Sequence, residues 1–165
     1  MKGIIITLLT IVALLTPTFC VVKSIRFDQQ CAGYLKQAAD ANTAELALDR
    51  LNKALDYVEG HNLTSGYTSA LWKTEDDNIG FWYENLKACQ AELQGCLEGT
   101  QLEKSNVLMK VRESLTDDGE KGTRLTIPNG ISRYPFNLPL GIMRLVSYLM
   151  LFFIFCYAIY ELVNE

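Results

Sequence analysis

The chain has 165 residues, 49% of them hydrophobic and 21% charged, and its 15 basic and 19 acidic groups give a formal net charge of −4. This length indicates a single domain. The acidic balance argues against a nucleic-acid partner, because neutralising phosphates needs a clustered Lys/Arg face, and the sequence has none. Residues 3–22 and 145–160 carry no charge at all, which argues against a purely cytosolic globule.

Residues 1–22 are predicted to form a signal anchor, the first of one or two transmembrane helices. Lys2 and the apolar run 4–15 have the basic start and the apolar centre of a signal sequence. The uncharged stretch continues to Val22, which is long enough to span a bilayer uncleaved, with Pro17 as a kink. Cleavage after Cys20 is the alternative, and it would leave a signal-peptide-processed, single-pass protein.

Residues 23–116 are predicted to form an antiparallel helical hairpin or small bundle, so that the fold class is all-α. Apolar residues recur at steps of three or four between Cys31 and Val58, which predicts a long helix that stops at a left-handed Gly60. Asn42 and Glu45 are expected to form a capping box that breaks or bends this helix near residues 40–43. The connection 60–73 then turns the chain back.

A second helix is predicted to begin at Thr74, whose hydroxyl would cap an acidic first turn. Its apolar residues follow the heptad spacing typical of a coiled coil: Ile79, Trp82, Leu86, Cys89, Leu93 and Cys96. A third, shorter helix begins at the capping box of Thr100 and Glu103. Its apolar face consists of Leu108, Val111 and Leu115.

Residues 117–139 are predicted to be an irregular linker that carries a small β-hairpin. Residues 117–122 read as a polar loop, and segments 124–127 and 131–134 would pair around a turn at 128–130. Pro135, Pro139 and Gly141 are expected to prevent helix formation until the next segment begins.

Residues 140–161 are predicted to form the C-terminal transmembrane helix. From Leu140 to Tyr160 there are 21 residues with one charge, Arg144, and this length spans roughly the 30 Å of a bilayer's hydrocarbon core. Arg144 lies near the start, where its stem can reach the headgroups. The alternative, a buried core helix, does not fit a segment that is apolar on every face.

The side of the membrane on which residues 23–139 lie is predicted from conflicting signs. Lys23, Arg26, Arg133 and Arg144 flank this loop, and the positive-inside rule would place it in the cytosol. That rule weakens for loops longer than about 60 residues, and the signal-like start favours export. We therefore expect an extracytoplasmic or luminal domain. The glycosylation sequon at Asn62 fits this side but occurs by chance too often to decide it.

The sequence predicts no catalytic, cofactor-binding or metal-binding residues. The only histidine is His61, the five cysteines contain no C-x-x-C pair, and no phosphate-binding glycine loop or nucleophile motif occurs. Two states are open for the cysteines: a disulfide of Cys31 with Cys89 or Cys96, or small buried thiols.

Aromatic side chains concentrate in the connection and at the start of the second helix. Tyr and Trp are preferred anchors at protein interfaces, so these residues are candidates for partner binding, with a cap over the hairpin's core as the alternative. Residues 40–98 carry 11 acidic and 4 basic groups, so we expect this end to project away from anionic headgroups. The candidate residues are Tyr67, Leu71, Trp72, Phe81 and Tyr83.

These features predict a non-enzymatic integral membrane protein that acts as a scaffold or accessory subunit. Its expected partners are the lipid bilayer and one or more proteins, in a homo-oligomer or a larger assembly, and not nucleic acid. An alternative is a minor structural protein of a membrane-containing virus particle, linking bilayer to shell. An enzyme would instead need a polar pocket within the helices.

Overall fold

The computed structural model describes residues 2–69, 72–119 and 122–164. These residues are mostly helical, with one small two-stranded sheet, which confirms the all-α prediction at the level of the main elements. In chain order the elements are α1 (Lys2–Phe27), the π-helical turn η1 (Asp28–Ala32), α2 (Gly33–Ala39), α3 (Ala44–Gly60), the 3₁₀ turn η2 (Glu75–Asp77), α4 (Ile79–Gly95), α5 (Gln101–Leu115), β1 (Thr116–Gly119), β2 (Gly122–Leu125), the 3₁₀ turn η3 (Ile131–Arg133) and α6 (Asn137–Asn164).

The first helix does not end where the apolar run ends. α1 continues through η1 into α2 with helical backbone angles on both sides of the π-turn. Phe27, Cys31 and Leu35 on this rod are buried in the core of the helical domain. The predicted boundary at residue 22 therefore falls inside a helix. α1 continues past the end of the uncharged segment because its next turns carry residues that the domain buries, beginning with Phe27.

The domain is a four-helix arrangement in which α3 and α5 each pack against the three other helices. α2 contacts α3 and α5, and α4 contacts the same two helices. α3 and α4 are antiparallel, since Glu59 near the end of α3 accepts a hydrogen bond from Tyr83 near the start of α4, while Asn52 pairs with Gln90 further along. The predicted seam of α4 is confirmed, because all six of its apolar positions are buried: Ile79, Trp82, Leu86, Cys89, Leu93 and Cys96.

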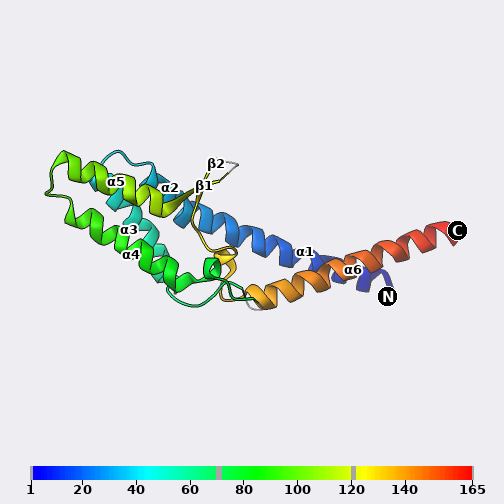
Figure 1. The fold of residues 1–165 in the computed structure, drawn as a ribbon. Helices are drawn as coiled ribbons and strands as arrows, with labels where there is room; N and C mark the ends of the chain where they lie inside the picture. The colour runs from blue at the N-terminus through cyan, green and yellow to red at the C-terminus, as the bar shows by residue number, and fades with distance from the viewer. Residues whose placement is uncertain (1, 70–71, 120–121, 165) are drawn as a thin grey trace.

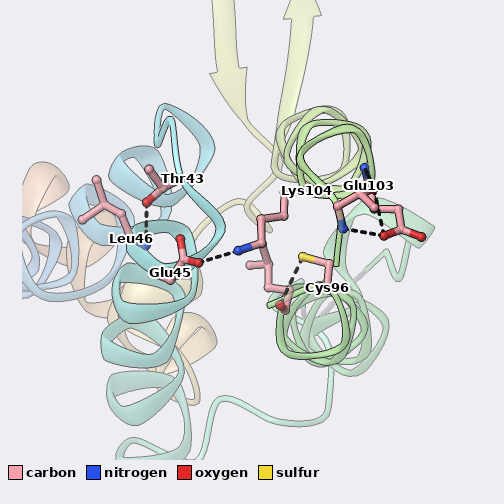
Figure 2. Close-up of polar contacts among 8 residues, drawn as sticks. Thr43, Glu45, Leu46, Cys96, Glu103 and Lys104 are labelled. Carbon is pink, nitrogen blue, oxygen red and sulfur yellow. Dashed lines mark hydrogen bonds and ion pairs between the residues drawn. The ribbon is translucent and has the colours of Figure 1, made fainter. Parts of the chain in front are cut away.

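The break between α2 and α3 is confirmed, but the cap at its end differs from the prediction. Thr43, not Asn42, is the N-cap of α3, and its hydroxyl accepts a hydrogen bond from the Leu46 N–H. Glu45 makes only a minor contact with the Thr43 hydroxyl. Its carboxylate accepts a hydrogen bond from Lys104 of α5 at 2.9 Å (Figure 2), and this bond lowers the Glu45 pKa.

α5 begins as the sequence predicts. The Thr100 hydroxyl accepts from the Glu103 N–H, and the Glu103 carboxylate accepts from the Thr100 N–H, which completes the capping box. Val111 and Leu115 are buried and Leu108 is half-buried. Arg112 on the same helix donates to the Ala39 carbonyl oxygen at 2.9 Å, so a cation caps the negative end of α2.

α4 also starts later than predicted. The acidic residues after Thr74 form the separate turn η2, and Asn78 caps α4 by accepting from the Phe81 N–H. The Thr74 hydroxyl instead donates to the Asp77 carboxylate at 2.7 Å. Thr74 and Asn78 are both good caps, and the seam begins at Ile79, so the cap next to the buried face is the one that α4 uses.

A β-hairpin is present, but it is not the predicted pairing of segments 124–127 and 131–134. β1 and β2 pair antiparallel, with Thr116 opposite Leu125, so strand structure occupies much of the region predicted to be a polar loop. Segment 131–134 forms η3 instead of a strand. The reason is that Thr116 continues directly from α5, whereas Gly130 adopts a positive φ of 79° and turns the chain into a 3₁₀ turn.

α6 is the one helix, within the described part of the chain, that is long and apolar enough by composition to cross a membrane, over Asn137–Tyr160. It begins three residues earlier than predicted. Pro139 lies in the first turn, where the missing N–H would have no helical partner in any case. Figure 1 shows α6 alongside α1, with both termini at the end remote from the helical domain.

The connection between α3 and α4 lies at the α6 end of the domain, beside the helix predicted to cross the membrane, whereas the charge of residues 40–98 predicts that this end projects away from the headgroups. The Asn137 amide at the start of α6 donates to the Thr68 carbonyl oxygen at 2.5 Å, and Figure 1 shows the connection beside the first turn of α6. The overall negative charge of residues 40–98 does not fix this placement, because chain direction does: α3 runs toward α6 and α4 runs away from it.

Candidate functional site

The connection between α3 and α4 is folded by local hydrogen bonds. Asn62, and not Gly60, takes the left-handed conformation after α3, with φ of 55°, which asparagine tolerates better than most residues. The Leu63 N–H then donates to the Val58 carbonyl oxygen at 2.8 Å. This bond and the burial of Leu63 are features of a Schellman motif, and they fix the direction in which the chain leaves α3.

The two ends of the connection are joined to each other. The Ile79 N–H donates to the Gly66 carbonyl oxygen at 2.9 Å, and Tyr67 and Asn78 form an isolated antiparallel bridge. The Asp77 carboxylate accepts hydrogen bonds from the hydroxyls of Thr74 and Thr68. These two bonds, that of Thr74 the stronger, lower the Asp77 pKa, so the carboxylate is ionised near neutral pH and keeps both threonines in place.

The aromatic surface consists of Tyr67, Trp72 and Phe81, three of the predicted partner-binding residues. Trp72 is 77% exposed, Phe81 61% and Tyr67 39%, so Trp72 and Phe81 do not cover the core as the alternative proposed. Tyr67 and Phe81 line one cavity of about 390 Å³. The other side chains that line it are those of Lys73, Thr74, Glu75 and Asn78.

The remaining predicted residues lie elsewhere. Tyr83 is half-buried on the α3 side of α4, where its hydroxyl donates to Glu59 at 2.8 Å, so it is separate from the aromatic surface. Leu71 lies outside the described residues. Sequence reasoning missed Lys73, whose ammonium lies 5.2 Å from the centre of the Tyr67 ring, a cation–π distance. The sequence feature that could have indicated Lys73 is its position directly after Trp72.

A second hollow, the basic pocket, lies where α1 enters the domain and where the chain approaches α6. Its volume is about 250 Å³. Its polar lining consists of Lys23, Arg26, Tyr57, His61, Ser132 and Tyr134. Sequence reasoning noted Lys23, Arg26 and Arg133 only as flanking charges, because nothing in the local pattern shows that α1, the end of α3 and the segment before α6 meet.

The structure contains all five cysteines as free thiols, so the disulfide of Cys31 with Cys89 or Cys96 is absent. η1, which carries Cys31, packs against α3, whereas the Cys89 thiol lies within hydrogen-bonding distance of Ser114 on α5. Burial raises the pKa of Cys31 to about 12. Cys31 and Cys89 thus contact different helices, and both are buried thiols, as the alternative expected.

We expect iodoacetamide at pH 8 to modify Cys31 much more slowly in the folded chain than in the denatured chain. With a pKa of about 12, only about one thiol in 10,000 is ionised at that pH, and the thiolate is the nucleophile. Peptide mass spectrometry at timed quenches measures the rate. Equal rates for Cys31 in the folded chain and in the urea-denatured chain would contradict the burial assigned to this thiol.

Within the residues that the structure describes, no three His, Cys, Asp or Glu side chains lie close enough to hold a metal ion. Both hollows instead combine aromatic rings with cations and hydroxyls, an arrangement suited to binding. Comparison of the chain with protein-family models, curated proteins and solved structures finds no match.

Proposed function

We propose that the chain is a non-enzymatic, two-pass membrane protein that acts as a scaffold or accessory subunit. In this proposal α1 and α6 cross the bilayer together, residues 23–139 lie on the extracytoplasmic side, and the aromatic surface binds a partner protein. The single observation that carries the binding role is the exposure of Trp72 in the connection and of Phe81 in the first turn of α4, beside a connection that is otherwise held by hydrogen bonds.

The membrane part of the proposal is supported by the outer surface of α6. Its large apolar side chains are exposed along most of the helix, among them Phe152, Phe153, Phe155 and Tyr160. An exposed apolar surface of this length needs a partner or a lipid environment. α1 contacts α6 and carries exposed apolar side chains of its own, Ile11, Leu14 and Leu15, which supports a common path through the bilayer.

Binding is favoured over catalysis by the character of the core. Among the described residues the buried set is apolar apart from Thr68 and Ser147. Thr68 is used to hold Asp77, and Ser147 donates to the Met143 carbonyl oxygen within α6. An active site needs polar groups that converge on a pocket, whereas the two buried polar side chains of the described residues are both used within the fold.

The place of the aromatic surface indicates what kind of partner it would meet. The hydrogen bond from Asn137 to Thr68 ties the connection to the first turn of α6, so the surface faces the bilayer end of the domain. A partner that is itself anchored in the same membrane could reach it. Large aromatic side chains with little core role are the usual anchors of such contacts.

We expect Trp72→Ala to weaken partner association about 30-fold, the equivalent of about 2 kcal/mol, while the melting temperature stays close to that of the unchanged chain. The reason is that an exposed ring contributes to a complex and little to the free domain. Tagged full-length chain is isolated from its native membranes in mild detergent, and quantitative mass spectrometry compares the proteins retained by each variant.

Leu102→Ala is the matched control, because Leu102 is 72% exposed at the opposite end of the domain and should change neither property. Trp82→Ala is the converse control, since Trp82 is buried in the seam and should lower the melting temperature. A Trp72→Ala chain that retains its partners, or loses them only together with its stability, would reject the aromatic surface as a binding site.

A further inference from the structure

The basic pocket lies at the depth expected for lipid headgroups if α1 and α6 span the bilayer, so this inference rests on the anchoring proposed above. Lys23 directly follows the uncharged run of α1. Its ammonium lies 5.4 Å from the centre of the Phe136 ring, one residue before α6 begins, and 5.6 Å from that of Phe19. The mouth of the pocket is thus level with the end of the uncharged run of α1 and with the start of α6.

The pocket concentrates positive charge in an otherwise acidic domain. Lys23 and Arg26 are three residues apart on α1 and so lie on the same face of the helix. No carboxylate lines the pocket. Within the described ranges, the ion pairs of the chain involve Arg50, Lys53, Lys87, Lys104 and Lys110, so Lys23 and Arg26 are available to an anion.

The walls of the pocket are held in place by aromatic packing. The Tyr57 ring stacks on His61 with centroids 3.9 Å apart and contacts Phe27 edge-on at 5.9 Å. His61 Nδ1 lies 2.9 Å from the Tyr57 carbonyl oxygen, so this nitrogen donates and the imidazole orientation is fixed. Hydroxyl groups of Tyr57 and Ser132 add neutral hydrogen-bond donors to the two cations.

The size of the pocket also limits what can enter. About 250 Å³ is below the roughly 300–1,000 Å³ that usually enclose a drug-sized molecule. A phosphate with a short polar substituent requires less room, and any acyl chains attached to it would lie outside, along the exposed apolar faces of α1 and α6. Basic pockets at the ends of transmembrane helices are suited to such headgroups.

We propose that the basic pocket binds the phosphate headgroup of an anionic phospholipid, with Lys23 and Arg26 as the charged contacts. The bound headgroup would join α1, the end of α3 and the segment before α6 at one point. It would thereby fix the tilt of the helical domain over the membrane and the direction in which the aromatic surface faces.

The test uses the full-length chain in detergent, titrated with phosphatidylglycerol or with zwitterionic phosphatidylcholine, and native mass spectrometry counts the lipids bound per chain. We expect preference for phosphatidylglycerol, and about 30-fold weaker binding of it by the Lys23→Gln/Arg26→Gln double variant, because each cation near the surface contributes about fivefold. Lys36→Gln/Arg124→Gln is the control, since it removes two cations outside the pocket and should change nothing.

Four results would overturn the proposal. Equal binding of both lipids would show that headgroup charge plays no role. Equal losses of phosphatidylglycerol binding in both double variants would show that binding depends on the overall charge of the chain and not on the pocket. Displacement of phosphatidylglycerol by equimolar glycerol phosphate would assign the pocket to a soluble phosphate compound. Carbonate extraction distinguishes failure of the anchoring from failure of the pocket. If the anchoring is wrong, carbonate releases the unchanged chain from the membrane. If only the pocket is wrong, both double variants stay in the membrane and bind phosphatidylglycerol like the unchanged chain.

Discussion

Replacement of Leu51 or Leu86 with alanine should lower the free energy of unfolding by about 2–5 kcal/mol each. Leu51 on α3 and Leu86 on α4 are 0% and 1% exposed, and α3 and α4 pack directly against each other. Truncation removes buried methyl groups and leaves a cavity that the surrounding helices fill only in part. Since a domain of this size is stable by about 5–15 kcal/mol, either change should lower the melting temperature measured by circular dichroism in detergent.

Asp49→Ala and Lys87→Ala are the matched controls on the same two helices. Asp49 pairs with Lys53 at 2.9 Å and Lys87 with Glu59 at 3.6 Å, all at exposed positions. Exposed pairs contribute little, because water and salt screen them. If either control lowered the melting temperature as much as the leucine changes, the assignment of buried and exposed faces to α3 and α4 would be wrong.

The helices of the domain could be predicted because their cause is local. Steps of three and four place Leu51 and Leu86 on continuous apolar faces, and a hydroxyl three residues before a glutamate marks the start of α5 at Thr100. Which of several capping residues a helix uses is less certain. Asn42 and Thr43 both suit an N-cap, and the structure uses the residue next to the buried Ala44.

The linker was predicted less well because its structure depends on its neighbours. β1 follows α5 without a break, and the Thr126 N–H donates to the Leu115 carbonyl oxygen at 2.9 Å. That register is set by the end of a helix, which a search for alternating residues does not include. The basic pocket was missed for the same reason, since Lys23, His61 and Tyr134 come from three distant parts of the sequence.

Placement of the aromatic surface is the clearest case in which charge counting misled. The net charge of residues 40–98 indicates repulsion from anionic headgroups, yet Thr68 is hydrogen-bonded to Asn137 at the start of α6. The net charge of 59 residues does not determine which end of the domain lies next to α6, whereas the opposite directions of α3 and α4 do. Lys23 and Arg26, the cations that line the basic pocket, lie outside that sum altogether.

Gly66→Ala should lower the free energy of unfolding by about 2–5 kcal/mol. Gly66 has a φ of +102°, which side chains disfavour by roughly 1–2 kcal/mol. A methyl group there would also lie 2.3 Å from the Tyr134 hydroxyl oxygen and 3.0 Å from the ring carbon that bears it. Overpacking of this kind adds about 1–3 kcal/mol, because the Tyr134 ring must move away from the connection between α3 and α4.

A second background separates the two causes. In a Tyr134→Ala chain the overlap is gone, so Gly66→Ala should cost only the roughly 1–2 kcal/mol of the backbone. Chemical denaturation of all four chains gives the difference, which measures the contact between the connection and the segment before α6. An identical cost in both backgrounds would show that Gly66 and Tyr134 do not meet. Because Tyr134 also lines the basic pocket, a measured coupling would link the connection that carries the aromatic surface to the proposed headgroup site.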